Sequence, residues 1–388
     1  MAIAMTKSSP AFAAERTAFI STPLTMQRGG NWSRQILDNG GMAAAACAVS
    51  DLNGDGKPDI ACIGSATANL KWYENRGASP DPRPSLAVVE KISGFLGFYA
   101  EDGKPICEVK LGIFPHEAVL SRDGRFLYVS DNGVLWMTED APGTNTISIV
   151  DVQAMKLVRT IDLGRFHRPH GISWDTTGTK LRVTTERPFG LVMLDAASGK
   201  ILRDYDVDGK SPHMVTMGPD GHHAYVSNVD SGNVAAIDLG TGATKLLPTG
   251  ARAKGLVFNS KGDRAYVVNS GAATISIIDP ARFAVVGEIA TGKGAGRLAL
   301  TPDGKTLVYN LQQDHSVGFA DIASAKEVAV IDLGGNPLSL TTTRDGKHAF
   351  AAVQDQDKVF VICVPDRKIE RVIEKPKGAG PDPVIPLP

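Results

Sequence analysis

A glycine that recurs at a near-constant interval constrains the fold more than any other feature of the chain. Similar segments such as RDGRFLYVS, PDGHHAYVS and PDGKTLVYN contain this glycine at six places, as Gly124, Gly178, Gly221, Gly262, Gly304 and Gly346. The successive intervals are 54, 43, 41, 42 and 42 residues. A period of this length indicates a repeat protein, in which each unit is stabilised by packing against its neighbours.

The unit at residues 211–250, SPHMVTMGPDGHHAYVSNVDSGNVAAIDLGTGATKLLPTG, shows what each repeat contains. It has four short β-prone runs, at 213–217, 223–228, 233–238 and 244–248, separated by the turn formers PDG, DSG and GTG. Helical repeats would need an i, i+3, i+4 apolar pattern over longer segments. Four strands make a small sheet that needs stacked neighbours. The sequence therefore predicts an all-β fold, a β-propeller of four-stranded blades.

Counting the units gives seven blades in one domain. Residues 1–30 are expected to be a leader or a disordered N-terminus, and residues 31–375 a single propeller. Within it, residues 31–111 would form an irregular first blade and residues 112–375 six regular blades. Residues 32–37 would close the ring beside the last blade, and residues 376–388 would be a tail without strand pattern. The alternative is eight blades, with residues 32–37 and 69–74 completing a separate blade.

Composition narrows the range of partners. A formal net charge of −1 with 21% charged residues gives no basic field, so nucleic acid is not an expected partner. The chain has no run of 18 apolar residues, so no membrane span is expected. The N-terminal stretch MAIAMTKSSPAFAAE resembles a signal-peptidase site but lacks an apolar core segment. We expect a periplasmic or secreted protein that begins near Ala14, with a cytoplasmic protein as the alternative.

An oxygen-rich loop, DLNGDGKPD, lies between two apolar runs near the N-terminus. Its spacing is that of a calcium loop, and a carbonyl near Lys57 would complete the ligands Asp51, Asn53, Asp55 and Asp59. Such a Ca²⁺ would be structural, because protein oxygens fill its coordination sphere. The alternative is a polar hairpin turn without metal.

Cys47 and Cys62 flank this loop at nearly equal distances from its centre. In an antiparallel hairpin they would lie almost opposite each other, which allows a disulfide. Two small buried thiols are the alternative.

The first strands of the repeats align as PHEAV, PHGIS, PHMVT, AKGLV, GRLAL and PLSLT. One column of this alignment should face the central channel, and it contains His116, His170, His213, Lys254, Arg297 and Leu338. Three neutral imidazoles could bind a transition metal such as Zn or Cu and leave a coordination position open. The cations could instead bind a small anionic molecule. The third interpretation is that each imidazole only bonds to a backbone carbonyl.

A second ring of polar residues follows the second strand of each repeat. Glu186 and Arg187 stand where other repeats have Asn, so we expect Glu186 to be a general base and Arg187 to contact the ligand. Glu117 and Arg168 would support them. The motifs of serine hydrolases, zinc peptidases, P-loop proteins and dinucleotide-binding proteins are absent from the sequence.

The segments YVSNVDSGNVAAIDLGTG and YVVNSGAATISIIDP resemble the YVTN family of β-propellers, and the resemblance covers residues 94–375. DLNGDGKPDI and NLKWYENRG, within residues 43–75, resemble the FG-GAP calcium loop of integrin-like propellers. The YVTN resemblance implies an exported bacterial protein, but its scaffold carries surface proteins, metal-handling proteins, lactonases and lyases.

From these observations we expect an anionic ligand, a metal ion or both at the His-lined channel mouth, with metal-assisted lyase or lactonase activity as the catalytic form. The alternative is a non-catalytic scaffold for a protein or glycan partner.

Overall fold

A computed structural model describes residues 32–36, 44–64, 70–75 and 83–388. The expected leader at residues 1–30 lies outside these ranges. The chain divides into two compact units, residues 1–83 and residues 84–388. Within the described residues the regular elements are strands, apart from one 3-10 turn, η1 (Gln354–Gln356), and no described helix is long and apolar enough to cross a membrane.

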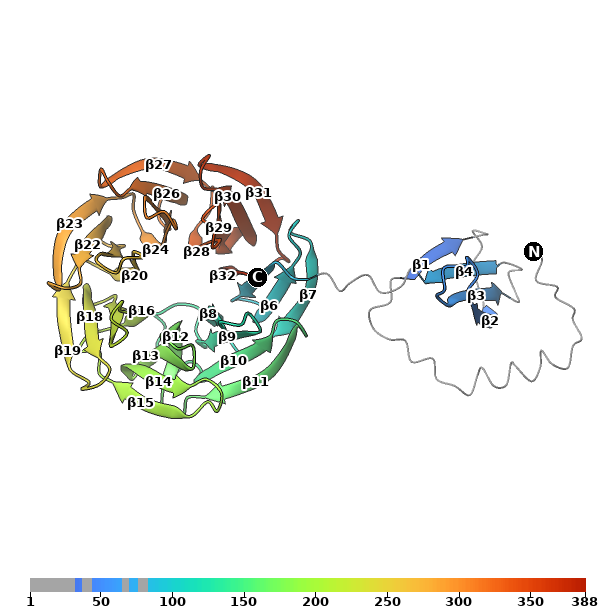
Figure 1. Ribbon diagram of the computed structural model, residues 1–388, viewed down its shortest axis with the longest axis horizontal. Helices are drawn as coiled ribbons and strands as arrows, with labels where there is room; N and C mark the ends of the chain where they lie inside the picture. The colour runs from blue at the N-terminus through green and yellow to red at the C-terminus, as the bar shows by residue number, and fades with distance from the viewer. Residues whose placement is uncertain (1–31, 37–43, 65–69, 76–82) are drawn as a thin grey trace, which may run out of the picture. The chain divides into compact units, whose positions relative to one another are not determined.

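The second unit is a ring of seven four-stranded sheets around a central channel (Figure 1). The expected fold class, an all-β seven-bladed propeller, is therefore confirmed. The alternative of eight blades is wrong as a count, although residues 32–36 and 70–75, which it placed together, do pair in a separate sheet. Consecutive strands are antiparallel neighbours in six of the sheets, and the PDG-type turns join the first strand to the second as predicted.

The six regular blades contain strands β8 to β31 in chain order. Their innermost strands are β8 (Pro115–Leu120), β12 (His167–Trp174), β16 (Pro212–Met217), β20 (Ala253–Phe258), β24 (Ala295–Leu300) and β28 (Pro337–Thr342). The second strands are β9 (Phe126–Asp131), β13 (Lys180–Arg187), β17 (His223–Asn228), β21 (Ala265–Asn269), β25 (Thr306–Leu311) and β29 (His348–Val353). The third strands are β10 (Thr146–Asp151), β14 (Phe189–Asp195), β18 (Asn233–Asp238), β22 (Thr274–Asp279), β26 (Ser316–Asp321) and β30 (Lys358–Cys363). The outermost are β11 (Lys156–Asp162), β15 (Ile201–Tyr205), β19 (Thr244–Pro248), β23 (Ala284–Ala290), β27 (Lys326–Asp332) and β31 (Lys368–Glu374).

Both ends of the propeller chain build the remaining blade. Its strand order is β32 (Pro381–Pro386), β5 (Leu86–Glu90), β6 (Phe95–Tyr99) and β7 (Pro105–Lys110). The expectation of a C-terminal tail without strand structure was wrong, because residues 381–386 form the innermost strand. Its prolines lack N–H donors, but an innermost strand has one neighbour and leaves its other edge toward the channel. Proline is tolerated there.

The hydrophobic core lies between adjacent blades. One cluster joins Ile149 of β10 to Leu181 and Val192 of the next blade, all almost fully buried. At the closure another cluster joins Val384 of β32 to Phe350 of β29. The blades are therefore stacked sheets, as the repeat pattern requires.

A buried ion pair also spans the closure. Lys375 Nζ lies 2.8 Å from Glu90 Oε1, and the Tyr99 hydroxyl donates to the same oxygen at 3.2 Å. Burial lowers the pKa of Lys375 to about 8, although Glu90 opposes this effect. The contact therefore links the segment after β31 to the blade that contains β5 and β6.

The N-terminal unit is a sheet of its own with strand order β1 (Trp32–Ile36), β4 (Leu70–Asn75), β3 (Asp59–Gly64) and β2 (Ala44–Ser50). Residues 31–111 were expected to form one irregular blade, and this is wrong: the strands before residue 83 pair among themselves. Strand β1 pairs with β4, not with the last blade. The prediction failed because the local sequence pattern of four short strands does not show whether they join a ring or form a separate sheet.

Cys47 and Cys62 are directly opposite in the β2–β3 register and form a disulfide, as the hairpin spacing allowed. We expect the double substitution Cys47→Ala/Cys62→Ala to destabilise the N-terminal sheet by about 3 kcal/mol, because the bond closes a loop with a sequence separation of 15. Hydrogen exchange of β2 and β3 would measure this, with Cys363→Ala as the control. Unchanged protection in the double variant would contradict the prediction.

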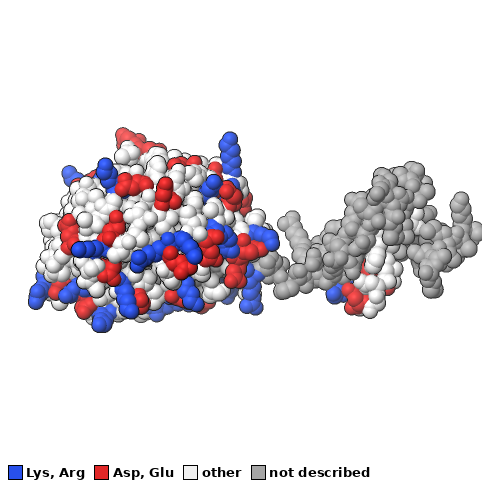
Figure 2. Space-filling model, turned by 90° about the horizontal axis from the view of Figure 1, so that it is seen from above, with Lys and Arg blue, Asp and Glu red and all other residues white. Residues whose placement is uncertain are grey.

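Lys, Arg, Asp and Glu side chains are interspersed over the side of the propeller shown in Figure 2. The absence of a nucleic-acid partner stays a prediction.

Candidate functional site

The innermost strands all begin at one end of the channel, and each begins with an irregularity in its pairing. The shifts follow Pro115, Pro169, Pro212, Ala253, Ala295, Pro337 and Pro381. The residues immediately after them therefore occupy equivalent positions, which are His116, His170, His213, Lys254, Gly296, Leu338 and Asp382. A bulge re-aims side chains next to functional sites.

This register corrects the sequence alignment at one position. Arg297 lies one residue later than the column, at the position equivalent to Glu117. The seventh member of the column is Asp382, which stands after Pro381 as the histidines stand after their prolines. The alignment missed Asp382 because the tail was not recognised as an innermost strand.

A cavity of about 100 Å³ lies at this end of the channel. Its lining includes five predicted ligand residues and the predicted base, namely His116, His170, His213, Lys254, Arg297 and Glu186. Arg187, the sixth predicted ligand residue, is not among the lining residues: it is exposed and pairs with Asp140 at 2.8 Å. The lining also contains residues that the sequence did not indicate, among them Lys91, Asp382, Gln312 and Trp136.

The three imidazoles are packed together. The ring centroids of His116 and His170 are 4.2 Å apart, and those of His170 and His213 are also 4.2 Å apart. Burial lowers the pKa of all three rings, and neighbouring cationic or potentially cationic groups lower those of His170 and His213 further, well below the ordinary value. The rings are therefore neutral near pH 7, and each has a nitrogen lone pair.

His116 is oriented by a carboxylate. Its Nδ1 lies 2.6 Å from Asp382 Oδ2, and Lys91 Nζ lies 3.7 Å from the same oxygen. Burial would raise the pKa of Asp382, but His116 and Lys91 outweigh burial and the pKa falls below its ordinary value. An ionised carboxylate only accepts hydrogen bonds, so Nδ1 of the neutral ring donates and Nε2 keeps its lone pair. That Nε2 lies 2.9 Å from Nε2 of His170.

Arg297 reaches across the channel. Its Nη2 pairs with Glu117 Oε1 on β8, and its Nη1 lies 3.2 Å from His213 Nε2 on β16. Both members of the ion pair are buried, with 8% of each residue exposed. The pair joins blades on different sides of the channel and lies beside the histidines.

Glu186 is held by Arg168, whose Nη1 lies 3.3 Å from Glu186 Oε2. Its other oxygen, Oε1, is buried and has no hydrogen-bond partner among the described residues. Burial raises the pKa of Glu186 to about 7, against the effects of Arg168 and Asn132. The carboxyl group can therefore gain or lose a proton near neutral pH.

Arg168 also fixes the insertion that lengthens the first interval of the repeat. It donates to the Glu139 carbonyl at 2.5 Å, and residues 135–137 of this insertion line the cavity. Trp136 is 47% exposed, so its ring lies between the cavity and solvent. The insertion thus forms one wall of the site.

Lys254 has a neutral partner. Its Nζ donates to Gln312 Oε1 at 2.9 Å, and no carboxylate among the described residues forms an ion pair with it. Burial, Arg297 and Arg252 lower its pKa to about 7. This lysine is the cavity's one cation without an acidic partner in the described part of the chain.

The predicted calcium loop is held by its own backbone. Asp51 Oδ1 accepts from the Gly54 N–H at 2.7 Å, and Asp59 Oδ2 accepts from the Leu52 N–H at 3.1 Å. Within the described ranges, one group of three possible metal ligands brings its ligand atoms together, and it consists of His116, Glu117 and His170. The carboxylates of the loop do not form such a group among these residues. Calcium at Asp51, Asn53, Asp55 and Asp59 stays a prediction.

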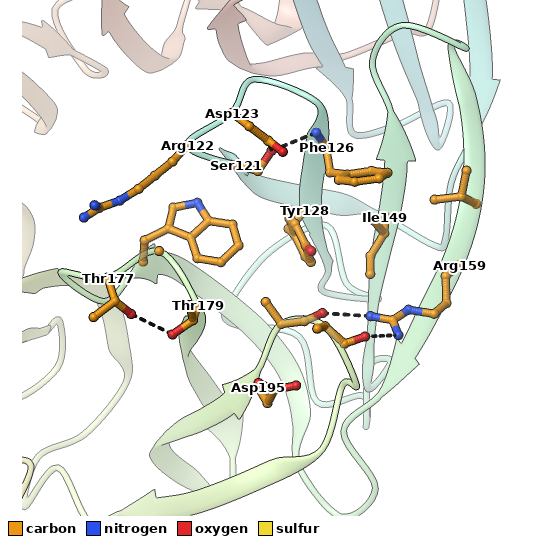
Figure 3. Close-up of a pocket in the computed structure, with 15 residues that line it drawn as sticks. Ser121, Arg122, Asp123, Phe126, Tyr128, Ile149, Arg159, Thr177, Thr179 and Asp195 are labelled. Atoms are coloured by element: carbon orange, nitrogen blue, oxygen red, sulfur yellow. Dashed lines mark hydrogen bonds between the residues drawn. The ribbon is translucent and has the colours of Figure 1, made fainter.

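A larger cavity, of about 650 Å³, lies between two blades at the opposite ends of β8 and β12 (Figure 3). Tyr128 and Trp174 meet there edge to face at 5.1 Å, and Arg159 donates to the Ala196 and Ala197 carbonyls. Tyr225 and Phe258 form the equivalent pair at 5.0 Å between two later blades. The aromatic contact is therefore part of the packing between blades.

Comparisons with known proteins agree with this architecture. No family model matches the chain. The uncharacterised protein YncE of Salmonella typhimurium is 27% identical over 287 residues, which cover 71% of this chain and 76% of YncE. A protein of unknown function from Desulfotomaculum acetoxidans has a TM-score of 0.65 at 13% identity, covering 77% of this chain and 98% of its own. The periplasmic gluconolactonase PpgL of Pseudomonas aeruginosa has a TM-score of 0.64 at 16% identity, covering 79% and 99%.

The chain is a seven-bladed β-propeller. At these identities the solved structures show the fold alone, so the channel-mouth residues carry the argument about function.

Proposed function

We propose that the channel-mouth cavity binds a small, singly charged anion such as a carboxylate. The proposal rests on the balance between buried cations and acids around the cavity. Three buried cations each pair with an acid, in Lys91–Asp382, Arg297–Glu117 and Arg168–Glu186. Lys254 adds one positive charge, and its partner is an uncharged amide. Because a buried charge is costly without a counter-charge, a bound anion would complete the site.

The size of the cavity restricts the ligand. A volume of about 100 Å³ corresponds to several water-sized spaces, at roughly 10–15 Å³ each. That accommodates a molecule of a few non-hydrogen atoms. A large glycan or a peptide does not fit inside it, although the cavity itself says nothing about partners on the outer surface.

We expect acetate and L-lactate to bind the wild-type protein and to lose at least about tenfold in affinity in Lys254→Met. The pKa of Lys254 is about 7, so the lysine is charged below that pH and the affinity is greatest there. As the pH rises through about 7 the affinity should fall, by up to about tenfold per pH unit. Ionisation of Glu186 in the same range acts in the same direction.

Isothermal titration calorimetry on either side of pH 7 measures both effects. Lys261→Met, which changes an exposed lysine of the same blade, is the matched control. Equal affinities in Lys254→Met and the wild type would contradict the anion site. If neither acid binds, the non-catalytic scaffold becomes the better interpretation.

A transition metal held by His116 and His170 is a second candidate, and one observation favours it. The two Nε2 atoms are 2.9 Å apart, and at metal–nitrogen distances of about 2.0–2.1 Å this separation corresponds to a ligand angle of roughly 90°. Asp382 on Nδ1 of His116 is the kind of carboxylate that orients a metal-binding imidazole. Glu117 could supply a third ligand if Arg297 moved. His213 would then contact His170 and Arg297, not the metal.

We expect Zn²⁺ to bind with one equivalent at this site, and His170→Ala to abolish that binding. Asp382→Asn should weaken it by about 10- to 100-fold. Metal titration followed by calorimetry measures this, with His222→Ala at an exposed position as the control. Zinc binding that is unchanged in His170→Ala would rule out the metal site.

Lyase or lactonase activity would be the catalytic form of either proposal. Glu186 is the group best placed to act as a general base. Its Oε1 is buried without a hydrogen-bond partner among the described residues, and its pKa is about 7.

Export to the periplasm or beyond the cell remains part of the proposal. The Cys47–Cys62 disulfide supports it, because such bonds persist in oxidising compartments. The intact mass of the protein from its native source would test it, since an unprocessed N-terminus would argue for the cytoplasm.

A further inference from the structure

The two lysines of the channel-mouth cavity differ in what surrounds their amines. Lys91 Nζ lies 3.7 Å from the Asp382 carboxylate, and although burial lowers the pKa of Lys91, this carboxylate opposes the effect. Lys254 bonds to the Gln312 amide and is influenced by two guanidinium groups, Arg297 and Arg252. Neighbouring cations and burial favour the neutral amine, which is the nucleophilic form.

We propose that Lys254 condenses with the carbonyl group of a small 2-oxo acid and holds it as an imine in the cavity. The proposal rests on the anion site described above and names its ligand class. It requires a lysine in a water-poor cavity, a proton donor in the same cavity and a charge that matches the ligand.

The reaction balances with groups already present. The neutral Lys254 amine attacks the carbonyl carbon, and the C=O electron pair moves to oxygen, which takes a proton from the nitrogen to give a carbinolamine. The nitrogen lone pair then forms the C=N bond while the C–O bond breaks. A proton from the acid form of Glu186 converts the departing hydroxide to water. One water leaves, and no oxidant or reductant is needed.

Glu186 suits this step because its Oε1 is buried without a partner among the described residues, while Arg168 holds its other oxygen at 3.3 Å. With a pKa of about 7, a large fraction carries the proton at neutral pH. Lys254, also with a pKa of about 7, is neutral in a similar fraction. An acid and an amine in one cavity are therefore both available in the forms that the reaction uses.

The charge of the product identifies the substrate as an acid and not a simple aldehyde. The iminium ion carries the positive charge of the proton that Glu186 donates, and a carboxylate beside the carbonyl carbon compensates it. The cavity volume of about 100 Å³ limits the substrate to the smallest 2-oxo acids, such as glyoxylate and pyruvate.

Borohydride reduction of the full-length protein in the presence of pyruvate tests the proposal. Intact mass and peptide mapping should find one reduced pyruvate on Lys254. Lys254→Arg lacks the condensing amine, so its labelling should fall to that of surface lysines. Lys261→Arg, at an exposed position of the same blade, should label like the wild type.

The outcomes separate the two proposals. If L-lactate binds but no label appears on Lys254, the imine proposal is overturned and the anion site stands. If neither L-lactate nor pyruvate binds, both fail. Labelling of Lys254→Arg equal to that of the wild type would assign the signal to other lysines and would also overturn the imine proposal.

Discussion

Deleting residues 381–388 is expected to leave the propeller largely unfolded or strongly destabilised at ambient temperature. The deletion removes β32, in which residues 381–384 are all buried. Burial of Val384 alone is worth about 1.5–3 kcal/mol, and lost ladder hydrogen bonds add about 1 kcal/mol each. Against a total stability of about 5–15 kcal/mol for a folded domain, this loss is large. It also leaves β5 with an unpaired edge toward the channel.

Urea denaturation followed by circular dichroism measures the effect. A chain that lacks only Pro388, which is exposed, serves as the control for the deletion. A synthetic peptide of residues 379–388 should restore part of the lost stability in trans, because the vacated position is an exposed strand edge. A truncated chain with the wild-type unfolding midpoint would show that β32 does not close the ring.

Arg297→Met is expected to destabilise the propeller by about 3–5 kcal/mol, because it leaves the Glu117 carboxylate buried without its partner. Glu117→Gln should cost a similar amount by leaving the Arg297 guanidinium unpaired. The double variant should recover most of the loss, since the remaining side chains are uncharged. The effect is therefore one of charge pairing and not of packing volume.

A double-mutant cycle from chemical denaturation separates these contributions. Additive losses in the double variant would mean that the two side chains act independently across the channel. Arg203→Met is a suitable control, because this half-buried arginine donates to the carbonyls of Leu239, Gly240 and Thr241 in the neighbouring blade.

The repeat in the sequence was sufficient for the fold class and for six of the blades. The spacing of Gly124 to Gly346 reflects turns that every blade needs, so local pattern and global fold agree there. The remaining blade was not predictable in the same way. Strand β32 has prolines at 381, 383 and 386, which argue against a strand unless it has only one neighbour. Which segment takes that position depends on the closed ring.

The candidate site was partly predictable for a related reason. The Pro-His pairs that contain His116, His170 and His213 identified the channel-facing column, because packing between blades does not require a repeated histidine. Arg297 was misplaced by one residue, since the bulge in β24 cannot be read from GRLAL without its pairing. Lys91 and Gln312 were missed because they converge across the ring and share no repeat position.

The pairing of β32 with β5 has a consequence for how the protein is made. It brings Glu90 and Pro381 together, two residues 291 positions apart. Contacts between such distant segments form slowly, because a long loop must close first. During synthesis the first six repeats can stack as they leave the ribosome, before Asp382 and the rest of β32 have been made. Any ligand that depends on the oriented His116 would thus bind only after β32 has joined the ring, so binding would report on ring closure.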